Sequence, residues 1–247
     1  MSDKTSIEPL QGKNIAIVAM GQSQIDFHLS QINSVIFDEV WAINAMIGAL
    51  PNIDRAFILD PMSRFLDTED AGSMTDMMRI QLPLANYPIY SCELDARVPS
   101  VIEYPLQSVV EETGCSYFNN TIAYSIAFAL WKKVKSISLF GVDFTYKSNI
   151  HFAEAGRACV EFWLAKCMDA KMIVSISPRS SLLDTNIDIK DKLYGYHRLN
   201  DPKITYQNGS GIKVCKFSDI EIEEKRKPVG MIDRNDIDLS PPEPKKY

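Results

Sequence analysis

The chain has 247 residues, of which 46% are hydrophobic and 23% are charged, and its formal net charge is −6. This composition suits one globular domain, or one domain with a small appendage. A general nucleic-acid-binding role is disfavoured, because nonspecific phosphate binding needs an excess of Lys and Arg. No apolar run reaches the length that a transmembrane helix needs.

The cysteines and histidines argue against a disulfide framework and against a zinc site. Five cysteines and three histidines are scattered without metal-ligand spacing, and no Cys-x-x-Cys pair occurs. Residues 1–13 form a polar lead-in that lacks the apolar core of a signal peptide. We therefore expect reduced thiols in a cytoplasmic protein.

The first predicted strand covers residues 14–20, a continuous apolar run that is typical of a strand buried on both faces. It ends at Gly21, Gln22 and Ser23, and a helical pattern follows. Such a turn can present backbone N–H groups and a helix N-terminus to a phosphate. A plain tight turn is the alternative interpretation.

Two further strands are predicted over residues 38–44 and 54–60, and they end in Asn44 and Asp60. Together with Gly21, three successive strands thus end in a small or polar residue. In open α/β sheets, ligands bind beyond the carboxyl ends of the strands, so these residues are expected at one site. For Asp60, a role in the following turn is the alternative.

The next segment is less regular. Residues 62–85 are predicted to be helical or irregular, and residues 87–91 resemble a short strand, with Pro88 indicating an edge strand or a strand start. Residues 92–113 contain Pro99 and Pro105, so a connecting loop with a short helix is expected.

The most informative stretch, residues 114–151, reads as turn, helix, strand and polar loop. Asn119, Asn120 and Thr121 are favourable N-cap residues, and an apolar helical run follows them at once. A buried-strand pattern over residues 136–140 comes next. The helix start is therefore predicted to face the same cleft as the strand ends.

Polar residues follow that strand where a site is expected: Asp143, Tyr146 and His151. Histidine can accept a proton at neutral pH, so His151 is a candidate general base. An ordinary polar loop histidine is the alternative. After the next predicted helix and strand, a polar turn holds Arg179, whose planar guanidinium suits a phosphate or carboxylate, although it could equally be a solvated loop residue.

Alternating strands and helices predict an α/β, Rossmann-like fold with a largely parallel sheet and flanking helices, plus a C-terminal hairpin and tail. The expected parts are a lead-in over residues 1–13, a nucleotide-binding domain over 14–183, a loop and hairpin over 184–217, and a charged, flexible tail over 218–247.

Several motifs, in their order, resemble a known family. They are VAMGQS at residues 18–23, AIN at 42–44, the strand-ending Asp60, NNTIAYSIAFAL at 119–130, and ISLFGVDF at 137–144 followed by Tyr146 and His151. This pattern resembles the sialyltransferase-like glycosyltransferases of family 42 and the related motility accessory factors, which include flagellin nonulosonate transferases and an archaeal pterin pyrophosphokinase. Similar uncharacterised proteins are frequent in phage genomes, so the resemblance also suggests a phage origin.

The resemblance implies a glycosyltransferase that uses a nucleotide-activated sugar, with a CMP-sugar as the leading example. It implies that His151 deprotonates the acceptor hydroxyl and that Tyr146 assists the phosphate leaving group, with Asp143 beside them. The predicted nucleotide-binding residues are Gly21, Gln22, Ser23, Asn44, Asp60, Asn119, Asn120, Thr121 and Arg179.

No metal site and no cofactor besides the donor are expected under this hypothesis, and a homo-oligomer is compatible with it. Two alternatives stay open. One is a metal-dependent pyrophosphokinase or other nucleotide-processing enzyme of the same fold, in which Asp60 and Asp143 would hold Mg²⁺. The other is a nonenzymatic nucleotide-binding or host-interaction protein, because fold alone does not choose among these functions.

Overall fold

The computed structural model describes residues 9–145, 149–208 and 211–220. The chain divides into two compact units, with the boundary after Leu182. Most of the expected lead-in, most of the expected tail and Tyr146 lie outside the described residues.

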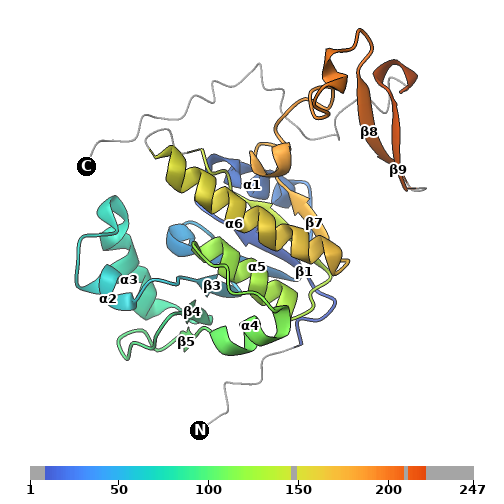
Figure 1. Ribbon diagram of the computed structural model, residues 1–247. Helices are drawn as coiled ribbons and strands as arrows, with labels where there is room; N and C mark the ends of the chain where they lie inside the picture. Colours follow the sequence, from blue (N-terminus) through green and yellow to red (C-terminus); the bar gives the residue numbers. More distant parts are fainter. Residues whose placement is uncertain (1–8, 146–148, 209–210, 221–247) are drawn as a thin grey trace. The chain divides into compact units, whose positions relative to one another are not determined.

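The first unit is built on a seven-stranded sheet in which every paired strand is parallel (Figure 1). The strand order is β5-β4-β3-β2-β1-β6-β7. This confirms the predicted α/β, Rossmann-like class. The strands are β1 (Asn14–Val18), β2 (Glu39–Ile43), β3 (Arg55–Phe57), β4 (Ile89–Ser91), β5 (Val101–Glu103), β6 (Ser136–Phe140) and β7 (Ile173–Ile176).

The strand order contains one reversal, which marks the expected position of a ligand site. From β1 the chain proceeds outward through β2 to β5, and then returns to the other side of β1 with β6. In sheets of this kind, ligands bind at the carboxyl ends of the strands, where the order reverses. The turns that follow β1 and β6 therefore lie at this switch point.

Helices cover both faces of the sheet, and each strand sends alternate side chains to the two faces. On one face, Ile15 and Ile17 pack in a core with α4, α5 and α6. On the other face, Ala16 and Val18 pack in a core with α1, α2 and α3. The helices are α1 (Ile25–Ile32), α2 (Met62–Leu66), α3 (Thr75–Leu84), α4 (Leu106–Thr113), α5 (Thr121–Trp131) and α6 (Ile150–Asp169).

Of the two roles predicted for Pro88, the structure shows the strand start. Pro88 directly precedes the first residue of β4, where the missing N–H is tolerated. The strand is not an edge strand, because β4 lies between β3 and β5. The edge strand β5 was not predicted, since three residues between two prolines carry too short a pattern to separate from a loop.

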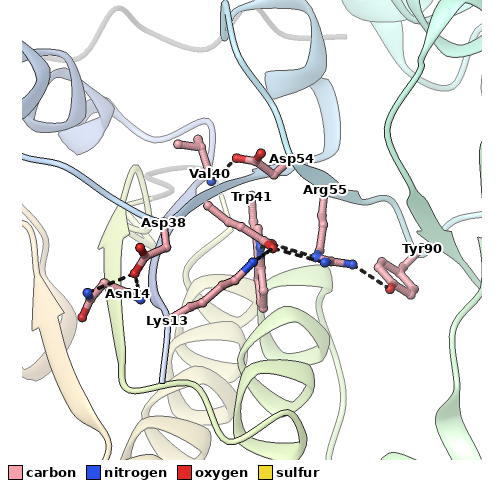
Figure 2. Close-up of polar contacts among 9 residues, drawn as sticks. Lys13, Asn14, Asp38, Val40, Trp41, Asp54, Arg55 and Tyr90 are labelled. Atoms are coloured by element: carbon pink, nitrogen blue, oxygen red, sulfur yellow. Dashed lines mark hydrogen bonds and ion pairs between the residues drawn. The ribbon is translucent and has the colours of Figure 1, made fainter. Parts of the chain in front are cut away.

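A buried ion pair joins the amino ends of β2 and β3 (Figure 2). Arg55 donates from Nε to Oε2 of Glu39 at 2.7 Å and from Nη2 to Oε1 at 3.2 Å. Lys13 and the indole of Trp41 also donate to this carboxylate, at 3.1 and 2.8 Å. Arg55 donates further to the Tyr90 hydroxyl at 3.3 Å. The charges are thus matched by hydrogen bonds, as buried charges require.

The surroundings of Glu39 change its proton affinity. Burial alone would raise the pKa of Glu39, but hydrogen bonds from Arg55, Trp41 and Lys13 outweigh it and lower the pKa below the ordinary 4.5. Glu39 is therefore an ionised structural residue. Glu39 lies at the amino ends of the strands, whereas ligands are expected at their carboxyl ends.

The second unit contains an antiparallel hairpin of β8 (Lys203–Asn208) and β9 (Gly211–Lys216), as the sequence predicts. A short 3-10 helix (Tyr196–Arg198) precedes it. Among the helices that the structure describes, none combines the length and the apolar character needed to cross a membrane.

Candidate functional site

The turns after β1 and β6 are fastened together by Ser23 and Asp143. The backbone N–H of Ser23 donates to Oδ2 of Asp143 at 2.8 Å, and the Ser23 hydroxyl donates to Oδ1. The same hydroxyl accepts the N–H of Gly141 at 2.8 Å. Asp143 is only 8% exposed, so this contact lies inside the protein.

Two glycines allow this close approach. A Cβ on Gly21 would lie 2.5 Å from Asp143 Oδ2 and 2.6 Å from the carbonyl oxygen of Gly141. Gly141 has a φ of +70°, and a Cβ there would lie 2.0 Å from the carbonyl oxygen of Ala19. Glycine at both positions therefore follows from packing between two turns.

The pKa of Asp143 reflects two opposing effects. Burial raises it, and the hydrogen bonds from Ser23 partly offset that rise. The N–H and the hydroxyl of Ser23 are both engaged with this carboxylate. The assignment of Gly21, Gln22 and Ser23 to a nucleotide, and of Asp143 to catalysis, stays a prediction.

A pocket of about 520 Å³ opens beside this switch point, within the size range of roughly 300–1,000 Å³ that is typical of small-molecule sites. It brings together five of the predicted site residues, contributed by the segments after β2 and β3 and by the start of α5: Asn44, Asp60, Asn119, Asn120 and Thr121. The other lining residues are Leu59, Arg64, Phe118, Ile122, Tyr124, Phe144 and Phe152.

Asn44 is unusual in both backbone and side chain. It begins the short 3-10 helix η2 (Asn44–Gly48) directly after β2, and its φ of 51° is left-handed. Its side-chain oxygen Oδ1 is buried and has no hydrogen-bond partner among the described residues. Buried acceptors are nearly always paired, and strained backbone collects at binding sites, so this atom is suited to a ligand donor.

The start of α5 is held against the first part of α6. Asn120 caps α5 by accepting the N–H of Ala123 on Oδ1 at 3.0 Å, and its Nδ2 donates to the Gly156 carbonyl at 3.2 Å. Asn119 donates to the Ala155 carbonyl at 2.9 Å. These amides therefore position the helix start.

The first backbone N–H groups of a helix have no acceptor within it, and they favour an anion. At α5 this positive end lines the pocket, since Thr121 and Ile122 are its first two residues. The start of α5 therefore supplies the pocket with N–H donors, which suit a phosphate.

Aromatic rings form another part of the pocket lining. Phe118 stacks on Tyr124, with ring centroids 4.4 Å apart, and on Trp163, at 5.0 Å. Phe144 packs tightly on α6, because a Cβ on Gly156 would lie 2.5 Å from its ring. Sequence reasoning missed these rings, since nothing in a local pattern separates a pocket aromatic from a core aromatic.

The pocket has one cationic side chain among its described lining residues, Arg64, which sequence reasoning also missed. It forms an ion pair with Asp60, in which Nη1 lies 2.5 Å from Oδ1. Asp60 lies between β3 and α2, and Arg64 lies in α2. Both side chains remain more than a third exposed. Arg64 is therefore accessible to an anionic ligand.

His151 lies in the first turn of α6, and its side chain is fully exposed. Its Nδ1 is 3.8 Å from Oε2 of Glu154. His151 does not line the pocket, although the next residue, Phe152, does. The catalytic roles assigned to His151 and to Tyr146, which lies outside the described residues, stay predictions.

Arg179 is engaged with a partner away from the pocket lining. Its guanidinium forms an ion pair with Asp26 of α1, and their side chains are 15% and 10% exposed. The hydroxyl of Ser177 donates to the same carboxylate. Asp26 was not predicted to take part in the site, and the phosphate-binding role of Arg179 stays a prediction.

Within residues 9–145, 149–208 and 211–220, no group of three or more His, Cys, Asp or Glu side chains could hold a metal ion. All five cysteines are free thiols.

Comparisons with known proteins give a loose structural likeness. No family model matches the sequence, and no curated protein matches it. One solved structure that resembles this chain is the sialyltransferase CstII from Campylobacter jejuni in complex with the substrate analogue CMP-3FNeuAc. It is 16% identical, the match covers 68% of this chain and 82% of that chain, and the TM-score is 0.46.

A second structure of CstII, with cytidine-5'-monophosphate, is also 16% identical. That match covers 70% of this chain and 83% of the other, with a TM-score of 0.45. At such TM-scores the likeness is too loose to assign a function.

Proposed function

We propose that the protein is a glycosyltransferase-like enzyme that binds a nucleotide-activated sugar in the pocket beside the switch point. The observation that supports this most directly is the buried Oδ1 of Asn44, which has no hydrogen-bond partner in the described part of the chain. An unpaired buried acceptor costs about 1–3 kcal/mol, and a ligand N–H or O–H would remove that cost. A base amine and a ribose hydroxyl are such donors, and a CMP-sugar contains both.

The phosphate of the donor would bind where the pocket is positive. The N–H groups at the start of α5 favour an anion, and Arg64 offers a planar guanidinium in the same pocket. The aromatic rings of Phe118 and Tyr124 would contact the flat faces of the ligand. This combination suits a nucleotide better than an inorganic anion, since an inorganic anion would contact neither the rings of Phe118 and Tyr124 nor the side chain of Asn44.

In the proposed reaction, the acceptor hydroxyl attacks the anomeric carbon of the donor sugar. A glycosidic C–O bond forms, the bond between that carbon and the phosphate oxygen breaks, and the nucleotide leaves with the electron pair. His151 takes the proton of the acceptor hydroxyl. Its full exposure at the first turn of α6, next to Phe152 of the pocket, leaves room for an acceptor to approach.

The test is a thermal-shift panel of CMP, UMP, ATP and nucleotide sugars, each with and without Mg²⁺, on the wild type and on Asn44→Ala. Stabilisation by CMP without Mg²⁺, lost in the variant, supports the proposal. Stabilisation by ATP only with Mg²⁺ would favour the pyrophosphokinase alternative. If the donor binds but a separate transfer assay detects no sugar transfer to any acceptor, a binding protein is favoured. If no nucleotide changes the melting temperature, both enzyme hypotheses are overturned.

A further inference from the structure

A second pocket lies at the amino ends of β3 and β4, whereas the pocket described above lies at the carboxyl ends of the strands. It has a volume of about 490 Å³. One wall is the segment from η2 to the start of β3, and the other is the end of α3 and the loop that leads to β4. None of the sequence motifs and none of the proposed catalytic residues belong to it.

Uncharged amide groups dominate the chemistry of this second pocket. Asn52, Gln81 and Asn86 line it, and none of the three side chains has a hydrogen-bond partner among the described residues. A side-chain amide offers two donors and one acceptor oxygen. The pocket thus presents donors and acceptors together, which matches hydroxyl groups, since a hydroxyl both donates and accepts.

The single carboxylate of the pocket limits the charge of the ligand. Oδ2 of Asp54 accepts the backbone N–H of Val40 at 2.8 Å, as Figure 2 shows, and no partner of Oδ1 is found within the part of the chain that the structure describes. No Lys, Arg or His is among the described lining residues. An anion would therefore meet a negative charge with no compensating cation.

Apolar lining residues complete the pocket. Pro51 and Leu84 lie in its walls, and the half-buried ring of Tyr87 offers a flat surface. Burial raises the pKa of the Tyr87 hydroxyl, which keeps this group a neutral donor. Sugar rings carry C–H groups on one side and hydroxyls at the rim, and small-molecule sites combine apolar area with a few placed polar groups in this way.

The walls of this pocket are firmly packed. Ile47 and Leu50 on one wall belong to a buried core, and Ala85 and Tyr87 on the other wall pack against the same core. At Gly48, an added Cβ would lie 2.2 Å from Sδ of Met77, so η2 and α3 approach closely. A pocket with fixed walls loses little conformational entropy when a ligand binds.

We infer that this pocket binds an uncharged saccharide unit and forms a carbohydrate site separate from the nucleotide pocket. Amide groups of Asn52, Gln81 and Asn86 would bind the hydroxyls, and the Asp54 carboxylate would accept a hydrogen bond from one hydroxyl. Pro51, Leu84 and the Tyr87 ring would contact the C–H face. The inference does not depend on the proposed transferase activity, because the two pockets share no lining residue.

The experiment titrates the full chain with methyl β-glycosides of glucose, galactose and N-acetylglucosamine, using calorimetry and amide chemical shifts. At least one glycoside is expected to bind with 1:1 stoichiometry and to shift the amides of Asn86 and Tyr87. Gln81→Ala and Asn86→Ala should each weaken binding about five- to tenfold, because each removes one neutral hydrogen bond of roughly 1 kcal/mol.

Two controls make the result specific. Gln107→Ala changes a glutamine of α4 that lies outside both pockets and should leave the dissociation constant within about twofold. Methyl glucuronide, which is anionic, should bind at least about tenfold more weakly than methyl glucoside, because its carboxylate faces Asp54. Asn44→Ala should leave glycoside binding unchanged.

The inference is overturned if no glycoside binds at millimolar concentrations, or if the Gln81 and Asn86 variants bind like the wild type. Tighter binding of the glucuronide would overturn the assignment to an uncharged ligand. Loss of glycoside binding in Asn44→Ala would place the sugar in the nucleotide pocket instead. Circular dichroism on each variant confirms that a lost signal does not come from unfolding.

Discussion

Ser23 and Asp143 are 120 residues apart in sequence, yet Ser23 donates both its backbone N–H and its hydroxyl to the Asp143 carboxylate. This double contact joins the turns after β1 and β6 at the switch point of the sheet. Because both donors of Ser23 are engaged, the contact orients the two turns relative to each other. It also accounts for Gly21, whose Cβ position is occupied by Asp143.

Ser23→Ala should therefore reduce stability. The change removes the hydrogen bond to Asp143 and the acceptor of the Gly141 N–H, so the free energy of unfolding should fall by about 1–3 kcal/mol. Urea denaturation measures this, with the exposed Ser108→Ala on α4 as the matched control. Unchanged stability together with weaker nucleotide binding would mean that Ser23 contacts the ligand.

Asn44→Gly should separate stability from binding. Glycine accepts the left-handed φ of 51° without strain and removes the buried unpaired oxygen, so the free energy of unfolding should stay unchanged or rise by up to about 1 kcal/mol. Nucleotide affinity should fall roughly tenfold, because a ligand hydrogen bond is lost.

The matched control for this variant is Ser34→Gly, which replaces another residue with a left-handed backbone, φ 59°, outside the pocket. It should leave affinity unchanged. Titration calorimetry with CMP and thermal unfolding measure the two effects. A large loss of stability in Asn44→Gly would show that the asparagine is structural.

His151→Ala should lower turnover by about 10²–10⁴-fold if His151 is the general base, while nucleotide binding stays at the wild-type level. The side chain is fully exposed, so stability should not change. Single-turnover sugar transfer and a CMP titration measure the two quantities. His28→Ala, an exposed histidine on α1, serves as the control, and equal turnover in both variants would remove His151 from catalysis.

Glu39→Gln should destabilise the fold in a pH-dependent way. At neutral pH it leaves the Arg55 guanidinium buried without a counter-charge, which costs about 3–5 kcal/mol. Because the folded pKa of Glu39 lies below the ordinary 4.5, its stabilisation is fully present above 4.5 and is lost as the pH falls through the folded value. The difference in the free energy of unfolding between wild type and variant should therefore narrow below pH 4.5.

Chemical denaturation at a series of pH values measures that gap. Glu112→Gln, which removes an exposed partner of Lys133, should cost no more than about 1 kcal/mol at any pH. A gap between wild type and Glu39→Gln that stays constant through the acid range would contradict the assigned role of Glu39.

The sequence alone was sufficient for the fold class and for the pocket residues that follow strands. Continuous apolar runs alternating with helical patterns predicted the parallel sheet, because period and run length are local properties of the chain. Asn44 and Asp60 were predicted for the same reason, since each follows an apolar run directly. The helix cap at Asn120 was predicted from residue type and confirmed in the structure.

The tertiary structure decided which partners these polar residues have. Asp143 and Arg179 look alike in sequence as free polar groups after strands, but Ser23 and Asp26 engage them. Those partners lie far away in the chain, so no local pattern reveals them. The place of the Phe118 ring and of the Arg64 guanidinium in the pocket was not predicted for the same reason. Residue type and spacing determine where a strand ends, whereas long-range packing determines which groups its terminal side chains contact.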